Sequence, residues 1–320
     1  MNRTKLHGVL PATITPFTAD GAVDWPAYEA YLRWMVSVPG VTGLVINGHA
    51  GEGSSLTVEE RRDAVALAVA VADGSVPVIA SANGDGSRVL AADARISVDA
   101  GADMLLVFPA PSWVRFGYQA GAPEERISAA HAASGLPVIA FQFPVETHAS
   151  FDQRTLLNIC DLDGVVAIKD GGRNMIRWDV DVPVIRREHP EIAILTCQDE
   201  FLLHTMWEAD GALVGYAALV PELMVSLFEA ARSHNYDRAK REYDRMADLT
   251  DLLYHRDSHI ESTVAMKLGL VARGLIPDAT VRRPLMPLGE SASAEVRSAL
   301  EAADIPVGAI ATVGAVGALS

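Results

Sequence analysis

The chain has 320 residues, of which 50% are apolar and 21% are charged, so it can bury a large core. Its formal net charge of -15 argues against nucleic-acid and anionic-membrane partners. The two cysteines show no metal-ligand spacing, no apolar run reaches the ~18 residues needed to span a bilayer, and the first residues lack a signal-type segment. We therefore expect a cytoplasmic protein with reduced thiols and with neither a membrane nor a nucleic-acid partner.

Short apolar runs rich in β-branched residues recur along the chain and alternate with segments of helical spacing. Such runs are typical of strands buried on both faces of a parallel sheet. Strands are expected at residues 8–14, 43–46, 76–80, 103–108, 137–141, 165–169, 192–196 and 211–215. Helices are expected at about residues 27–38, 57–71, 88–100, 124–133, 151–159, 200–209 and 221–233.

This alternation predicts an α/β protein with the (β/α)8 fold of a TIM barrel, in which catalytic groups lie at the carboxyl ends of the strands. Lys169, Gln142, Gly215 and the glycine-rich loop at 47–53 would converge at that end. The alternative fold is an open doubly wound sheet. It is disfavoured because the glycine-rich loop lacks the dinucleotide-binding spacing and follows the second strand, not the first.

No further strand is expected after residue 234. Helical spacing at 236–254, 262–273 and 294–302 predicts a helical extension over residues 235–304, added to a barrel domain over residues 1–234. The final stretch, 305–320, is rich in glycine, alanine and valine and carries no charge. We interpret it as a mobile tail or a contact between subunits.

The sixth predicted strand ends in Lys169 and Asp170 and is followed by two glycines. A lysine at the mouth of a buried strand loses hydration, which disfavours the ammonium form. A neutral amine can attack a ketone and form a Schiff base, so this position suits a covalent catalyst. The alternative is that Lys169 merely leaves the sheet and forms an ion pair with Asp170.

Several motifs then follow a familiar order. The loop Gly48-His49-Ala50-Gly51-Glu52, with the segment 56–61 after it, is similar to the Gly-Thr-Thr-Gly-Glu loop of the dihydrodipicolinate synthase and N-acetylneuraminate lyase superfamily. The strand ending at Lys169 resembles the Schiff-base strand of that superfamily. Segments 198–200, 211–215 and 283–288 resemble later landmarks, and the similarity covers roughly residues 6–290.

The resemblance implies a barrel whose lysine, here Lys169, forms an imine with pyruvate or another 2-keto acid. Members are aldolases and dehydratases that need no cofactor, and they are usually homotetramers. We accordingly expect a lysine-dependent lyase that acts on a small 2-keto acid and assembles as a homotetramer or homodimer.

The chain also departs from the pattern that the resemblance implies. The tyrosine expected at the end of the fifth strand, which relays protons, is Phe141, and the asparagine after it is Gln142. His49 and Ala50 replace the two threonines expected in the loop. Glu146 or a neighbour occupies the position of the arginine expected in dihydrodipicolinate synthases. Because phenylalanine can neither donate nor accept a proton, these changes argue against dihydrodipicolinate synthase itself.

His49 is our candidate for the missing proton relay, because imidazole can give and take a proton near neutral pH. The alternative is that His49 only hydrogen-bonds the backbone or lines the pocket. The backbone amides of His49, Ala50 and Gly51, which follow Gly48, could still hold a carboxylate without help from a side chain.

Further polar and aromatic groups lie near the predicted strand ends. Asp199 and Glu200 correspond to positions that contact the hydroxyl groups of sugar acids, so they could bind substrate, or they could be the first turn of a helix. Gly215 ends the eighth strand. Trp113 and Phe143 could form an apolar wall that would suit an aromatic or a short substrate.

Three functions remain open from the sequence. The leading hypothesis is an aldolase or dehydratase acting on a 2-keto acid such as pyruvate or a deoxy sugar acid. The second is an imine-forming hydrolase or deaminase, and the third is a barrel without catalysis that serves a regulatory role. We expect no metal, because the imine already supplies an electron sink, and because His255 and His259 read as part of a solvated turn beyond the barrel.

Overall fold

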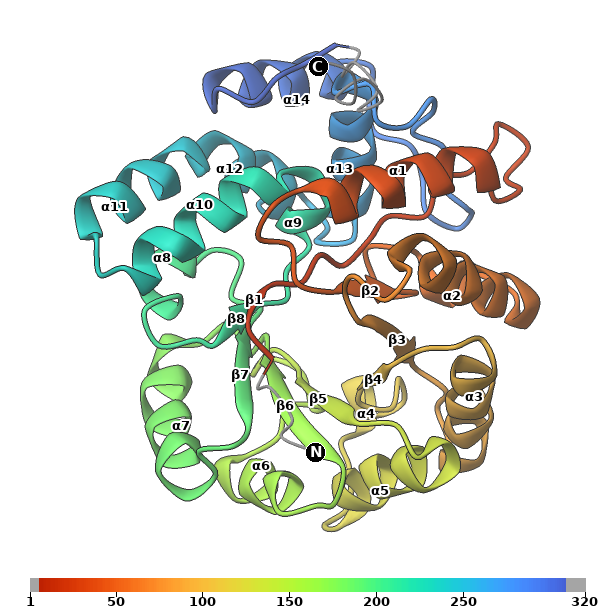
Figure 1. Ribbon diagram of the computed structural model, residues 1–320, viewed down its shortest axis with the longest axis vertical. Coiled ribbons are helices and arrows are strands. Elements are labelled where there is room, and N and C mark those ends of the chain that lie inside the picture. The colour runs from red at the N-terminus through yellow and green to blue at the C-terminus, as the bar shows by residue number, and fades with distance from the viewer. Residues whose placement is uncertain (1–5, 309–320) are drawn as a thin grey trace, which may run out of the picture.

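The computed structural model describes residues 6–308 and shows eight parallel strands curled into a ring, with helices around the outside (Figure 1). Neighbouring strands follow the order β1-β8-β7-β6-β5-β4-β3-β2. Parallel bridges between Val9 and Val41 and between Ala12 and Val45 join the two ends of this order. The strands are β1 Gly8–Val9, β2 Leu44–Ile46, β3 Val78–Ala82, β4 Met104–Val107, β5 Val138–Gln142, β6 Val165–Asp170, β7 Ala193–Thr196 and β8 Gly211–Ala212. The predicted (β/α)8 barrel is confirmed.

Helices cover the outer face of the ring and bury the strands, whose residues are almost all inaccessible to solvent. The helix after β2 begins where a capping box predicts, since the Thr57 hydroxyl accepts a hydrogen bond from Glu60 N at 3.2 Å and the Glu60 carboxylate accepts one from Thr57 N at 2.9 Å. The outer helices are α1 Trp25–Ser37, α2 Val58–Ala72, α3 Ser87–Asp99, α5 Ala122–Ser134, α6 Gln153–Cys160, α7 Met175–Glu188 and α10 Pro221–Arg232. Short helical turns are η1 Gly53–Ser55, α4 Trp113–Phe116, α8 Leu202–Thr205 and α9 Tyr216–Leu219.

Helix α7 was not among the helices expected from the sequence. Pro183 lies inside it, and charged residues interrupt the apolar spacing that would reveal it. Packing compensates, because Trp178, Val182 and Ile185 are buried against the barrel. The helix predicted at 200–209 is shorter than expected and is confined to α8.

The helices after α10 form the expected extension at one side of the ring (Figure 1). They are α11 Tyr236–Arg245, α12 Ala247–Tyr254, α13 Glu261–Ala272 and α14 Ala292–Ala302, so the single helix predicted over 236–254 is divided at Met246. Helix α13 packs on α9 and α12 and brings the extension against the carboxyl ends of the strands. Of the predicted tail, Ile305 is buried and Gly308 N donates to Ala272 O at 2.7 Å; the rest, 309–320, lies outside the described residues.

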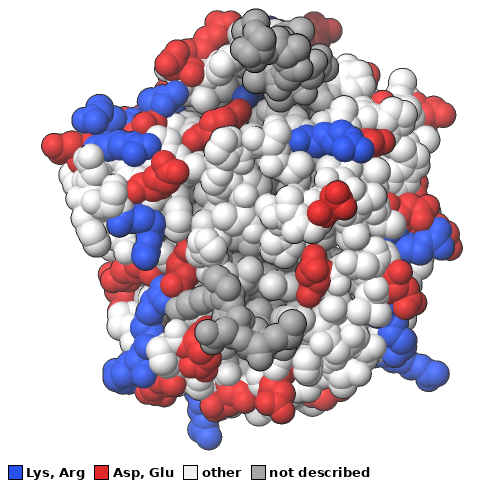
Figure 2. Space-filling model, viewed as in Figure 1, with Lys and Arg blue, Asp and Glu red and all other residues white. Residues whose placement is uncertain are grey.

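Acidic and basic side chains are interspersed around the edge of the face shown in Figure 2, and its centre is largely uncharged. This distribution agrees with the net negative charge of the chain. Over residues 6–308, each helix is too short or too polar to cross a bilayer.

Candidate active site

Lys169 lies at the carboxyl end of β6 and points into a cavity of about 400 Å³ at the mouth of the barrel. Its side chain is buried, and Nζ lies 3.9 Å from the centre of the Phe141 ring, which is its register partner on β5. Within the described part of the chain, Nζ makes no hydrogen bond or ion pair. The amine is therefore available to a molecule in the cavity.

Asp170 does not pair with Lys169, which removes the structural alternative for the lysine. Successive residues of a strand face opposite sides, so the Asp170 carboxylate turns away from the cavity. It accepts hydrogen bonds from Gly172 N at 2.9 Å and from Gln198 Nε2 at 2.6 Å. Burial raises the pKa of Asp170 to about 6.

The structure brings seven of the ten predicted site residues to the cavity wall. They are Gly48, His49, Ala50, Phe141, Lys169, Asp199 and Gly215. The other three, Gly51, Gln142 and Glu200, lie outside the wall, each for a different physical reason.

The loop after β2 forms a tight turn, and three of its backbone N–H groups take no part in the hydrogen bonds that close it. Glu52 N donates to His49 O at 3.0 Å and Gly53 N donates to Gly48 O at 3.1 Å, and these bonds close the turn. The N–H groups of His49, Ala50 and Gly51 donate to no other described residue. Three free amides in succession can hold a carboxylate.

Gly51 shapes this loop from behind. A Cβ at Gly51 would lie 2.8 Å from Thr13 O, so a side chain would not fit. Its carbonyl accepts a hydrogen bond from the Thr15 hydroxyl at 2.8 Å. Gly51 can therefore contribute its amide but has no surface on the cavity wall.

His49 presents its ring to the cavity among three phenylalanines. The ring centre lies 4.8 Å from that of Phe108, 5.9 Å from that of Phe143 and 6.5 Å from that of Phe141. The ring makes no hydrogen bond with a described residue, so it does not brace the backbone. Burial, followed by the nearby charge of Lys169, lowers the pKa of His49 to about 4. Because His49 is exposed to the cavity, solvation reduces this effect, and the imidazole is neutral at pH 7.

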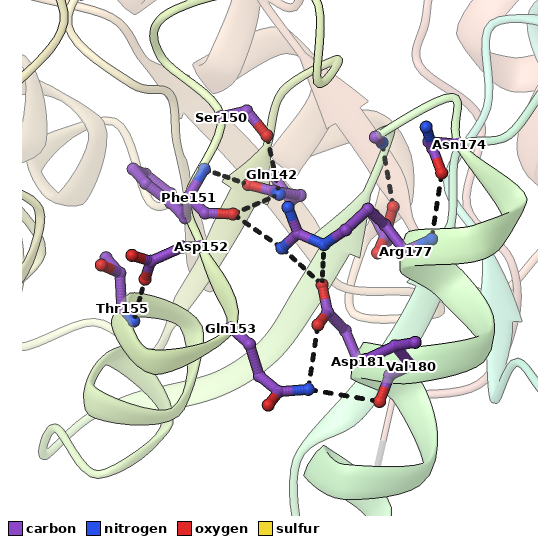
Figure 3. A network of polar contacts seen from close by, with 12 residues as sticks. Gln142, Ser150, Phe151, Asp152, Gln153, Thr155, Asn174, Arg177, Val180 and Asp181 are labelled. Carbon is purple, nitrogen blue, oxygen red and sulfur yellow. Dashed lines mark hydrogen bonds and ion pairs between the residues drawn. The ribbon is translucent and has the colours of Figure 1, made fainter.

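Gln142 is fully buried and holds a loop, instead of lining the cavity (Figure 3). Its Nε2 donates to Phe151 O at 2.9 Å and to the Ser150 hydroxyl at 3.1 Å, and its Oε1 accepts from Phe151 N at 2.8 Å. Arg177 donates to the same Phe151 carbonyl at 3.0 Å. The prediction that Gln142 contacts substrate is not supported by this placement, because its amide is already satisfied by protein.

Asp199 and Glu200 lie in a turn before α8, so neither is the first turn of a helix. Asp199 lines the cavity, and burial raises its pKa to about 6, although the nearby Arg173 acts in the opposite direction. Arg173 lies 3.6 Å from Asp199 Oδ2 and 3.2 Å from Glu200 Oε1. Glu200 thus faces Arg173 and stays outside the wall.

Arg173, Tyr254 and His259 line the cavity and were missed as site residues. Arg173 follows the two glycines after Lys169 and adopts a left-handed backbone with φ 51°, which redirects the chain. Its position four residues after Lys169 could have identified Arg173 as a site residue from the sequence. Tyr254 ends α12 and His259 precedes α13, so both come from the helical extension.

His259 was placed in a solvated turn, and the structure confirms an exposed turn at this residue, but His259 also lines the cavity. Its ring stacks on that of Tyr254 at 5.3 Å, and its Nδ1 lies 3.2 Å from Arg173 Nη1. Burial, followed by the charge of Arg173, lowers the pKa of His259. His255 is also exposed, and it pairs with Asp251 away from the cavity wall. Of the two expected wall residues, Phe143 lines the cavity, whereas Trp113 packs on Tyr118.

Comparison with known proteins agrees with this arrangement. The profile of the Dihydrodipicolinate synthetase family matches residues 5–303. The chain belongs to this family. The 4-hydroxy-tetrahydrodipicolinate synthase of Psychrobacter arcticus is 29% identical over 310 residues, which are 95% of this chain and 97% of the relative. The enzyme of the same name from Phenylobacterium zucineum is 31% identical over 302 residues, which are 93% and 98% of the two chains.

A solved structure gives the same picture. Chloride-inhibited dihydrodipicolinate synthase from Acinetobacter baumannii, complexed with pyruvate, is 26% identical and aligns with a TM-score of 0.84 over 94% of this chain and 100% of that one. The family resemblance is therefore confirmed, and it supports lyase chemistry in general.

Proposed function

We propose that this protein is a lysine-dependent aldolase or dehydratase that acts on a 2-keto acid through a Schiff base on Lys169. The observation that carries the proposal is the buried, unpaired amine of Lys169 at the wall of a cavity of about 400 Å³. The pyruvate complex of the Acinetobacter baumannii relative supports a keto acid as the class of ligand. The free amides at His49, Ala50 and Gly51 offer a place for its carboxylate.

The chemistry follows from these positions. The Lys169 amine attacks the keto carbon, and the carbinolamine loses water to give an iminium ion. The iminium then accepts the electron pair of a neighbouring C–H or C–C bond, which yields an enamine. No cofactor is required, because the iminium is the electron sink.

His49 is proposed to assist the loss of water from the carbinolamine. Its ring is neutral and free of protein hydrogen bonds, so it can accept or share a proton with a molecule beside Lys169. The other proposed contacts are Gly48, Ala50 and Gly51 at the carboxylate, Phe141 and Gly215 at the walls, and Asp199 at a substrate hydroxyl.

The substrate is proposed to be larger than pyruvate, and the enzyme is not dihydrodipicolinate synthase proper. A cavity of about 400 Å³ leaves room beyond a keto-acid head group, as a deoxy sugar acid would need. Phe141, His49 and Ala50 cannot supply the hydroxyl relay that the resemblance implies for the synthase. We further propose a homotetramer or homodimer, which light scattering of the purified protein would test.

Borohydride trapping tests the proposal directly. The protein is incubated with a panel of 2-keto acids and sodium borohydride, and adducts are read by intact mass and peptide mapping. We expect one adduct per chain on Lys169, none in Lys169→Met, and an unchanged adduct in the matched control Lys240→Met, whose amine is exposed and pairs with Asp244. No adduct with any keto acid would instead favour the barrel without catalysis.

A further inference from the structure

An imine enzyme must move protons at the carbon next to the imine, and the end of β5 offers no hydroxyl for that task. Phe141 occupies the position beside Lys169 and has no group that can carry a proton. The wall of the cavity does contain another tyrosine, Tyr254, which reaches it from the helical extension.

Tyr254 is held rigidly with its hydroxyl unsatisfied. The ring is packed between Tyr216 at 5.1 Å and His259 at 5.3 Å. The hydroxyl oxygen is buried and completes no well-aligned hydrogen bond with a described residue. It lies over Gly215, where an added Cβ would approach it to 2.9 Å, so the glycine that precedes α9 leaves room for it. A buried hydroxyl without a partner is costly in a folded protein unless a ligand or water completes it.

Asp199 lies next to this hydroxyl, and the two groups shift each other's pKa. Its Oδ1 is likewise buried without a hydrogen bond, whereas Oδ2 lies near Arg173 and, at 3.9 Å, the Cys197 thiol. Asp199 and Lys169 both line the cavity. Tyr254 and Asp199 thus lie side by side in the wall of the cavity that holds the amine.

We propose that Tyr254, backed by Asp199, carries protons to and from the carbon next to the imine. This inference rests on the proposed function, because it needs the imine on Lys169. It assigns to the helical extension the task that a strand-five tyrosine performs in the pattern implied by the resemblance. Tyr254 is then a catalytic residue, and the Asp199 carboxylate accepts the proton that Tyr254 gives up.

The step balances without another reactant. The C–H bond next to the iminium carbon breaks, and its proton goes to the Tyr254 oxygen while the hydroxyl proton of Tyr254 passes to Asp199. The electron pair of the C–H bond becomes the C=C bond of the enamine, and the C=N electron pair becomes the lone pair on nitrogen. The reverse transfer returns the proton to carbon and restores the iminium.

The acidities suit these roles. Burial raises the pKa of Tyr254 well above 10, so the hydroxyl stays protonated and relays a proton between the substrate carbon and Asp199. Burial raises the pKa of Asp199 to about 6, so its carboxylate is ionised at pH 7 and close to the range in which a general base works best.

Exchange of the C3 hydrogens of pyruvate in D2O, followed by proton NMR, measures this step alone. The probe is pyruvate, or whichever trapped 2-keto acid carries hydrogens on C3. We expect Tyr254→Phe to form the borohydride adduct on Lys169 as fully as the parent, while exchange falls by ~10²- to 10⁴-fold, the range for loss of general acid–base help. The substitution removes only the contact between the hydroxyl and Asp199, so the melting temperature should change little.

Two further variants make the result specific. Tyr216→Phe removes a neighbouring buried hydroxyl, which bonds Thr250, and should leave exchange unchanged. Adding Phe141→Tyr to the Tyr254→Phe protein should restore part of the exchange, because it returns a hydroxyl beside Lys169.

The outcomes separate this inference from the proposed function. Parent-like exchange in Tyr254→Phe, with the adduct intact, overturns the role of Tyr254 and leaves the imine standing. Absence of an adduct in the parent protein overturns both.

Discussion

Asp199→Asn is expected to stabilise the protein at pH 7 while it slows turnover. Asp199 is buried, and its pKa is raised to about 6 from an ordinary value of 3.8. At ~1.4 kcal/mol per pKa unit, this difference means that keeping the carboxylate ionised in the fold costs about 3 kcal/mol. Asparagine carries no charge, so it avoids up to that cost, while it can no longer store the proton from Tyr254.

The same shift sets the sign of the pH dependence. The folded state holds the Asp199 proton up to about pH 6, whereas the unfolded chain releases it near 3.8. Stability from this group is therefore complete below 3.8 and is lost as pH rises through about 6. Between pH 7 and pH 5 the parent protein should gain about 1.4 kcal/mol relative to Asp199→Asn.

Urea unfolding of both proteins at pH 5 and pH 7 measures this double difference. Asp170, whose pKa is also raised to about 6, is present in both proteins and cancels. The control Asp63→Asn changes an exposed carboxylate that pairs with Arg62, whose charge is constant over this range, and it should track the parent at both pH values. The reasoning is refuted if Asp199→Asn is less stable than the parent at pH 7 and keeps the parent's pH dependence.

The remaining predictions concern the loops around the site. Lys267→Met should cost about 3–5 kcal/mol in urea unfolding, because it leaves Glu52 charged and buried, and adding Glu52→Gln should recover much of the loss. Gln142→Ala should cost about 1–3 kcal/mol, because the buried N–H of Phe151 loses its partner while the Phe151 carbonyl keeps only Arg177, and a protein of parental stability would contradict this. His49→Ala should lose turnover but still be trapped on Lys169 at the end point of borohydride treatment; unchanged turnover would remove His49 from the mechanism.

The barrel and its lysine could be predicted from the sequence because both depend on local signals. A strand buried on both faces needs a continuous apolar run, and the residue at its end must lie at the mouth of the barrel. Lys169 is such a residue, and so is Phe141 at the end of β5, whereas Gly215 lies in the short connection between β8 and α9. For Lys169 and Phe141 the position in the chain determines the position in the fold.

The rest of the site could not be predicted because it depends on packing between distant segments. Gln142 and Phe141 are neighbours at the end of β5, yet they face opposite sides, and only the loop ending at Phe151 shows that the amide is already satisfied. Tyr254 lies 85 residues after Lys169 in a helix whose spacing says nothing about which strand end it covers. Its proximity to Asp199 follows from how α12 and α13 pack on α9, which is a tertiary fact.

The helical extension is therefore part of the site at both of its ends. At one end Tyr254 and His259 form the wall beyond Asp199. At the other, the Lys267 amine lies 2.5 Å from Glu52 Oε1 and donates to Thr280 O at 2.8 Å, so it holds the turn that carries the free amides. Arg282 strengthens this attachment, because its backbone N–H donates to the second Glu52 oxygen at 3.0 Å.

A barrel that ended at residue 234 would keep Lys169 but would lose the partner of a buried carboxylate and the only tyrosine that lines the cavity within the described residues. An uncompensated buried charge destabilises a fold by several kcal/mol, so the amide turn could not keep its shape. The carboxylate of a keto acid and the carbon beside its imine would then both lack their protein partners. The division into a catalytic barrel and an appended extension is thus a division of the sequence alone, because the amine, the anion-binding turn and the proton-carrying hydroxyl are held together only when both parts are present.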